Sequence, residues 1–133
     1  MSYPYRFIVP FQPVGYYASG KVPNWKRMKA YHAYKELVQL HASAAGLLLP
    51  LMATKDDPLF ISTCAYFRNG IHCDPGNVQK GIVDALFWTP RGKKSKGSGD
   101  KYTGGMFEVP KYDMLYPRVV VHVSRTGKGW AEK

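Results

Sequence analysis

Apolar and polar residues alternate in short segments along the chain, and glycine and proline separate the segments. Four segments rich in β-branched and aromatic residues predict strands: residues 5–10, 58–67, 102–109 and 117–124. The third of these is expected to be interrupted at Gly104 and Gly105. The unbroken valines at 119–121 indicate that the last strand is central or buried on both faces.

Two further stretches carry apolar residues at helical spacing. The first, residues 25–45, lies between a capping residue, Asn24, and a stop signal, Gly46. The second begins at Asp74 and Pro75, an N-cap acceptor followed by a residue suited to the first helical position. Its apolar stripe consists of Val78, Ile82, Ala85 and Leu86.

The second predicted helix also has a polar side, on which we expect the functional site. Asn77, Lys80 and Asp84 recur there at spacings of three and four residues. Asp74 stands at the junction between the preceding strand and this helix, where side chains converge. An acid, an amide and a lysine are therefore predicted to face solvent together.

The order of these residues resembles the signature of the RusA family of Holliday junction resolvases, roughly Asp-x-Asp-Asn-x-x-Lys-x-x-x-Asp-x-Leu. Five positions match in order: Asp74, Asn77, Lys80, Asp84 and Leu86. Gly76 stands where the family has its second acid. In the family a further acid follows the helix, and the resemblance assigns that position to Asp100, the one acid between Asp84 and Glu108.

The resemblance covers most of the chain and implies its fold and activity. It implies an α/β (α+β) domain over residues 1–133, with a mixed four-stranded sheet and two main helices, that forms a homodimer. The implied activity is Mg²⁺-dependent hydrolysis of four-way DNA junctions by paired nicking, with Mn²⁺ able to substitute. Such a protein works in the cytosol of a bacterium or of a phage-infected cell.

The resemblance also implies a role for each matching residue. Asp74 and Asp100 would come together around the metal, because hard Mg²⁺ prefers carboxylate ligands. Lys80 would hold the scissile phosphate or stabilise the charge that develops on it. Asn77 would orient a ligand or a water molecule, and Asp84 would pair with Lys80 and fix its direction.

Each of these assignments has a plainer alternative. Asp74 is also what an ordinary N-cap requires. A Lys80–Asp84 pair is a common surface contact worth a few tenths of a kcal/mol. Gly76 removes one negative charge from the metal site, which should weaken metal binding. The alternative function is therefore a protein that binds junctions or other DNA and cuts weakly or not at all.

Charge favours a polyanionic partner. The 133 residues include 19 Lys and Arg against nine Asp and Glu, which gives a net charge of +10 and a pI near 9.7. No apolar run approaches the roughly 20 residues that span a bilayer, and the N-terminus lacks the apolar core of a signal peptide. We therefore expect a cytosolic protein without a membrane partner. Cys64 and Cys73 are expected to be reduced thiols.

Residues outside the motif are also expected to contact DNA. The stretch 91–99 combines cations with glycine and serine and predicts a flexible arm that follows phosphates. Tyr16 and Tyr17, on a loop after the first strand, can stack on bases. The predicted contacts are Tyr16, Tyr17, Lys80, Arg91, Lys93, Lys94, Lys96 and Lys101. A single-strand or RNA binder is a third possibility, and residues 125–133 are expected to form a loose tail.

Overall fold

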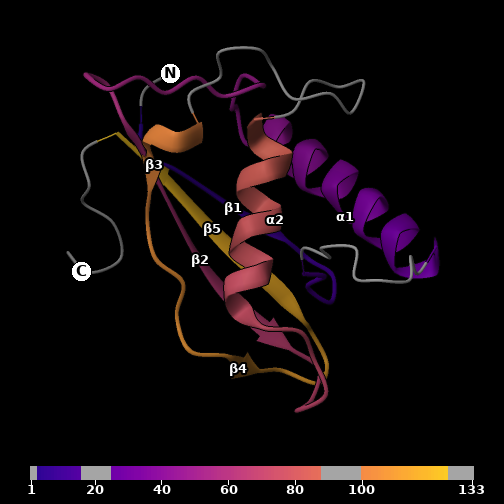
Figure 1. Cartoon of the computed structure of the whole chain (residues 1–133). Coiled ribbons are helices and arrows are strands. Elements are labelled where there is room, and N and C mark those ends of the chain that lie inside the picture. The colour runs from indigo at the N-terminus through magenta and orange to yellow at the C-terminus, as the bar shows by residue number, and fades with distance from the viewer. Residues whose placement is uncertain (1–2, 16–24, 88–99, 126–133) are drawn as a thin grey trace.

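A mixed five-stranded sheet with two helices on one face forms the fold (Figure 1). The computed structural model describes residues 3–15, 25–87 and 100–125. In chain order the elements are β1 (Tyr5–Val9), α1 (Trp25–Ala44), β2 (Leu59–Phe67), α2 (Pro75–Phe87), the 3₁₀-helix η1 (Asp100–Tyr102), β3 (Thr103–Gly104), β4 (Lys111–Tyr112) and β5 (Arg118–Ser124). The predicted mixed α/β class with two main helices is therefore confirmed.

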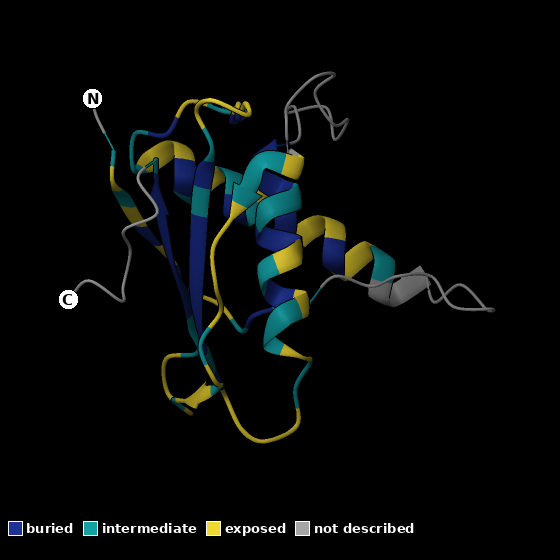
Figure 2. Ribbon diagram, turned by 60° about the vertical axis from the view of Figure 1, so that its left-hand side comes forward, coloured by how far each residue is buried: buried dark blue, intermediate teal, exposed yellow. Residues whose placement is uncertain are grey.

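The central strand is β5, as its valines predicted. It pairs antiparallel with β1 on one side and with β2 on the other. Val121 lies opposite Phe7 of β1 and Thr63 of β2. Val119, Val121 and Val123 have no exposed surface. The two helices lie on one face of the sheet (Figure 2), and these valines belong to the hydrophobic core.

Both helices begin and end close to their predicted limits. At the end of α1 the N–H of Leu47 donates to the carbonyl of Ala42, and the N–H of Gly46 donates to that of Ser43. This pair of bonds is a Schellman motif, and it requires the positive φ of 102° found at Gly46. The predicted glycine stop is therefore confirmed.

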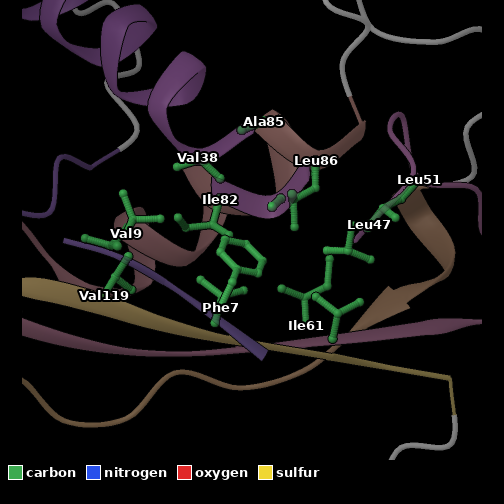
Figure 3. Packing of buried hydrophobic residues seen from close by; sticks show 14 of the residues in the cluster. Phe7, Val9, Val38, Leu47, Leu51, Ile61, Ile82, Ala85, Leu86 and Val119 are labelled. Atoms are coloured by element: carbon green, nitrogen blue, oxygen red, sulfur yellow. The ribbon is translucent and has the colours of Figure 1, made fainter. Parts of the chain in front are cut away.

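The core fills the space between the helices and the sheet (Figure 3). Ile82 and Leu86 of α2 are fully buried, and so are Val38 of α1 and Val9 of β1. The amide of Gln39 on α1 also donates to the carbonyl of Ala85 on α2 at 3.0 Å. Apolar packing and this cross-helix bond fix the position of α2 on the sheet.

The edge beyond β2 differs from the prediction of one strand over residues 102–109. Two short strands, β3 and β4, pair in parallel with the two ends of β2. Between them, a single parallel bridge pairs Phe107 with Thr63 in the middle of β2. Gly105 separates them with a φ of +130°, in a place where a Cβ would lie 1.9 Å from the carbonyl oxygen of Ile61. The backbone departs from strand geometry there, so the predicted four-stranded sheet has five strands.

Arg125, the first residue of the predicted loose tail, makes contacts with the rest of the fold. The guanidinium of Arg125 pairs with the carboxylate of Asp57 at 3.2 Å and donates to the carbonyl of Met52 at 3.1 Å. It also lies 4.9 Å from the centre of the Tyr3 ring. Arg125 is therefore anchored, whereas residues 126–133 lie outside the described part. Within the described ranges, neither helix is long and apolar enough to cross a membrane.

Candidate functional site

The first turn of α2 is built on Asp74. Oδ1 of Asp74 accepts a hydrogen bond from the N–H of Gly76 at 2.7 Å. Its carbonyl oxygen accepts from the N–H groups of Asn77 at 2.9 Å and Val78 at 3.2 Å. Pro75 supplies the fixed φ of the first helical position. Asp74 is therefore the N-cap of α2, as Asp-Pro predicted.

An aromatic ring occupies the space beside Gly76, where the resemblance expects a second acid. A Cβ on Gly76 would stand 3.2 Å from Cζ of Phe107 and 3.2 Å from Oδ1 of Asp74. Carbon atoms pack best at about 3.5–4.0 Å, so both approaches are tight. An acidic side chain at position 76 therefore requires the Phe107 ring to move.

The loop that follows β1 also reaches the N-terminus of α2. A Cβ on Gly15 would lie 3.0 Å from Sγ of Cys73 and 3.1 Å from Cβ of Asn77. Burial raises the pKa of the half-buried Cys73 thiol, while hydrogen bonds to the backbone of Cys73 and Gly15 act in the opposite direction. Both cysteines are free, as predicted. Tyr16 and Tyr17 come directly after Gly15 but lie outside the described residues.

His72 links the turn before α2 to β4. Its ring stacks on Phe67 with centroids 3.8 Å apart and an interplanar angle of 9°. Nδ1 lies 2.6 Å from the carbonyl oxygen of Cys73, and Nε2 lies 2.9 Å from the hydroxyl of Tyr112. A carbonyl accepts only, so Nδ1 carries the proton, and in the neutral ring Nε2 accepts from Tyr112. His72 therefore joins Phe67 at the end of β2 to Tyr112 of β4.

Lys80 and Asp84 continue along α2. Lys80 is exposed, one helical turn beyond Gly76 on the same side of the helix. Asp84 is half-buried and accepts a hydrogen bond from the hydroxyl of Tyr31 on α1 at 3.1 Å. Burial lowers the pKa of Lys35 on α1, and the charge of Asp84 opposes that effect. Asp84 thus links the two helices, and its predicted role in directing Lys80 stays a prediction.

The structure does not bring Asp74 and Asp100 together within one chain. Asp100 opens η1, just before Thr103, which pairs with Leu59 at the start of β2. Asp74 follows the end of β2 and caps the far end of α2 (Figure 1). A helix of 13 residues is about 20 Å long. The expectation that these acids share one cation is therefore corrected.

The physical reason is the connection from β2 through α2 to β3. Because β2 and β3 are parallel, the helix must return the chain to the start of β2. An acid before the helix and an acid after it then lie at opposite ends. The side chain of Asp100 is outside the described part. An aspartate side chain extends only a few ångströms from the backbone, and Mg²⁺ holds its ligands at about 2.1 Å, so one ion cannot bind carboxylates at both ends of the helix.

Most of the predicted DNA contacts lie outside the described residues. Lys101 is exposed, with Nζ 5.1 Å from the centre of the Tyr102 ring, at the same end of the sheet as Asp100. The other arm residues, Arg91, Lys93, Lys94 and Lys96, lie outside the described residues. Of the predicted contacts, Lys80 alone is described at the N-terminal half of α2.

The described residues of one chain do not supply the carboxylate pair that the resemblance implies for Mg²⁺. Asp74 uses Oδ1 in capping, Phe107 packs tightly beside position 76, and Asp100 is at the other end of α2. Within the described part, no group of three or more His, Cys, Asp or Glu side chains is placed to hold a metal ion. The donor set at Asp74 therefore does not fit the implied metal site.

Two residues at this site were not selected from the sequence. Phe107 and Tyr112 belong to the edge segment that was predicted as strand or left without a role. Their exposed fractions, 49% and 55%, are unusual for aromatic side chains. A local pattern does not reveal them, because the contacts to Gly76 and His72 depend on how the edge segment passes α2.

No protein-family model matches the sequence, and no curated protein matches it either. The likeness to the RusA family therefore depends on the five motif residues and their order.

Proposed function

We propose that the protein binds branched DNA, with a four-way junction as its preferred form, at the N-terminus of α2. One observation carries the proposal: Asp74, Asn77 and Lys80, the first three matching residues of the motif, are all exposed at this end of the helix. Leu86, the last matching residue, is fully buried and fixes the helix to the core. The motif therefore contains exposed residues that can contact a ligand and a buried residue that holds the helix in place.

The chemistry of this end suits a phosphate backbone. Lys80 offers an ammonium group, and Asn77 offers amide donors. The net charge of +10 adds an attraction that does not depend on sequence. A homodimer would present two such ends, and its two-fold symmetry would match that of a four-way junction. The protein would act in the cytosol, where such DNA forms.

A second candidate function is Mg²⁺-dependent cleavage of the junction, with Mn²⁺ able to substitute. The order of the motif favours it, and so does the exposure of the Asp74 carboxylate, of which only Oδ1 accepts a hydrogen bond from the described residues. A second chain would have to supply the other carboxylate, because Asp100 of the same chain is at the far end of α2.

Binding is tested with a labelled four-way junction and a duplex of equal length, by fluorescence anisotropy in chelator. We expect the junction to bind more tightly, and Lys80→Gln to weaken binding severalfold. Lys55→Gln, which removes an exposed cation from the loop before β2, is the matched control. If the junction is held no better than the duplex, both candidates fail. Competition by a single-stranded oligonucleotide tests the third possibility, a single-strand or RNA binder.

Cleavage is tested by adding Mg²⁺ to the same junction and resolving the products on a denaturing gel. Asp74→Asn is the informative variant, because Asn also caps helices and leaves the fold intact. Paired nicks that disappear in Asp74→Asn would support hydrolysis. Tight binding without nicks, in Mg²⁺ and in Mn²⁺, would leave the binding function alone.

A further inference from the structure

Phe107 is an exposed aromatic side chain beside the cap of α2. Its side of the edge segment faces the N-terminus of the helix, and 49% of its surface is accessible. The ring atoms Cζ and Cε1 lie 3.2 and 3.3 Å from where a Cβ of Gly76 would be. One part of the ring therefore rests on the helix backbone, and the rest faces solvent.

The backbone on both sides of Phe107 is fixed. The N–H of Thr63 donates to the carbonyl of Met106 at 3.0 Å, and the N–H of Glu108 donates to the carbonyl of Thr63 at 3.1 Å. These bonds join the edge segment to β2, a buried strand. A ring held in this way loses little conformational entropy when a ligand packs against it.

A cation on the neighbouring turn of α2 complements the ring as a nucleotide-binding group. Lys80 lies one turn beyond Gly76 on the same side of α2 and is an exposed residue. A base stacked on the ring would carry its phosphate toward a cation of a strongly basic protein. Aromatic rings accept any base in this way, because every base has a π-face.

We propose that Phe107 stacks on an unpaired or splayed base of the branched DNA bound at the N-terminus of α2. This inference rests on the proposed function and adds to it a specific binding residue and the part of the DNA that it contacts. It also gives Gly76 a reason: the missing side chain leaves room for the ring. At this position the chain has a stacking surface in place of a second carboxylate.

Other exposed apolar side chains, on the edge segment and in the turn before β5, suggest a competing occupant. Val109, Met114, Leu115 and Tyr116 are each more than 70% exposed on the same edge. A second copy of the chain could cover such a surface. Lys80 and the overall charge favour DNA at Phe107 itself, and self-association is made an outcome of the test.

The experiment uses the full chain in chelator and a four-way junction with 2-aminopurine at the branch point. Stacking on an aromatic ring quenches this base, and losing one stacked base weakens binding by about tenfold. We expect Phe107→Ala to bind the junction about tenfold more weakly and to lose the fluorescence change. Phe107→Trp should restore both. Val109→Ala, on the same segment, is the control and should match the parent protein.

Three outcomes would overturn the inference. The first is that Phe107→Ala binds as tightly as the parent and keeps the fluorescence change. The second is that Phe107→Ala and Val109→Ala weaken binding equally, which indicates a general apolar surface. The third is that Phe107→Ala converts a dimer into a monomer in sedimentation, which assigns the ring to self-association. If instead the parent protein itself does not prefer the junction, the proposed function fails at an earlier step.

A second variant tests the link between Gly76 and the ring. Gly76→Asn, which adds a side chain without a charge, should shift Phe107 and weaken junction binding in chelator, but it should have little further effect in a Phe107→Ala background. Effects that simply add in the double variant would show that the two positions act independently and would contradict the proposed stacking geometry.

Discussion

At the scale of single residues, Asp74 combines two roles that the sequence alone left open. Its Oδ1 caps α2 by accepting the N–H of Gly76, and its carboxylate remains exposed. Capping was predictable from Asp-Pro, because both residue types are favoured at the start of a helix. The ring that lies beside Gly76 was not predictable, because it comes from a segment about 30 residues later.

Replacing Asp74 separates the two roles. Asp74→Ala removes the acceptor for the Gly76 N–H, and we expect the free energy of unfolding to fall by about 1 kcal/mol. Asp74→Asn keeps an acceptor, and its free energy of unfolding should fall by only a few tenths of a kcal/mol. Urea unfolding followed by circular dichroism measures both. Equal losses in the two variants would show that charge, and not capping, is what Asp74 contributes to stability.

At the scale of elements, the sequence predicted those elements whose signals are local. The start of α2, the glycine end of α1 and the central valine strand follow from caps, stops and β-branched runs. The edge segment was predicted poorly because its conformation depends on the strand beside it. Gly105 passes so close to the carbonyl of Ile61 that regular pairing is interrupted there.

Gly105→Ala tests this account of the edge. An alanine would require both a positive φ and a Cβ 1.9 Å from the carbonyl oxygen of Ile61. We expect the free energy of unfolding to fall by about 3 kcal/mol or more. Gly70→Ala is the matched control, because a Cβ there has no heavy atom within 4 Å. Similar thermal midpoints for the two variants would contradict the backbone geometry of this edge.

The turn before β5 has a pH-dependent element. Hydrogen bonds from the backbone of Tyr116, and then from Arg118, hold the pKa of Asp113 below its ordinary value of 3.8, with a further bond from Leu115. A carboxylate with a lowered pKa in the folded state stabilises the fold above the unfolded-state pKa. That stabilisation is lost as the pH falls below about 4 and passes the folded-state pKa.

Asp113→Asn should therefore reduce the acid sensitivity of the protein. We expect the difference in unfolding free energy between pH 6 and pH 3 to be smaller in this variant than in the parent. Asp56→Asn, at an exposed loop position, is the comparison. An unchanged difference in Asp113→Asn would show that this carboxylate does not contribute to acid unfolding.

At the scale of the whole molecule, the main error of the sequence analysis was one of topology. Asp74 directly precedes α2 and Asp100 follows it after residues 88–99, and the resemblance brought them to one site. The parallel pairing of β2 and β3 places them at its two ends. The helix itself was predictable from its periodicity. Pairing between distant segments decides which strand β3 pairs with and in which direction, and a local pattern does not reveal it.

Charge is the other property of the whole molecule that leads to a prediction. If Arg91, Lys93, Lys94 and Lys96 contact phosphates, replacing all four with Gln should reduce the slope of log affinity against log salt by about 3 to 4. Titrations at several salt concentrations measure it. Lys55→Gln should leave the slope nearly unchanged. If the variant with all four replacements keeps the slope of the parent protein, the other cations of the chain make the phosphate contacts.

The position of Cys73 makes its thiol a native probe of the site at the start of α2. Cys64 is buried in β2, whereas Cys73 is half-buried where Gly15 meets the start of α2. The contact with Gly15 covers part of this thiol, so we expect its alkylation rate to rise when the loop after β1 moves away from the helix. A ligand seated there would slow the labelling, so native thiol footprinting can map occupancy without any engineered probe.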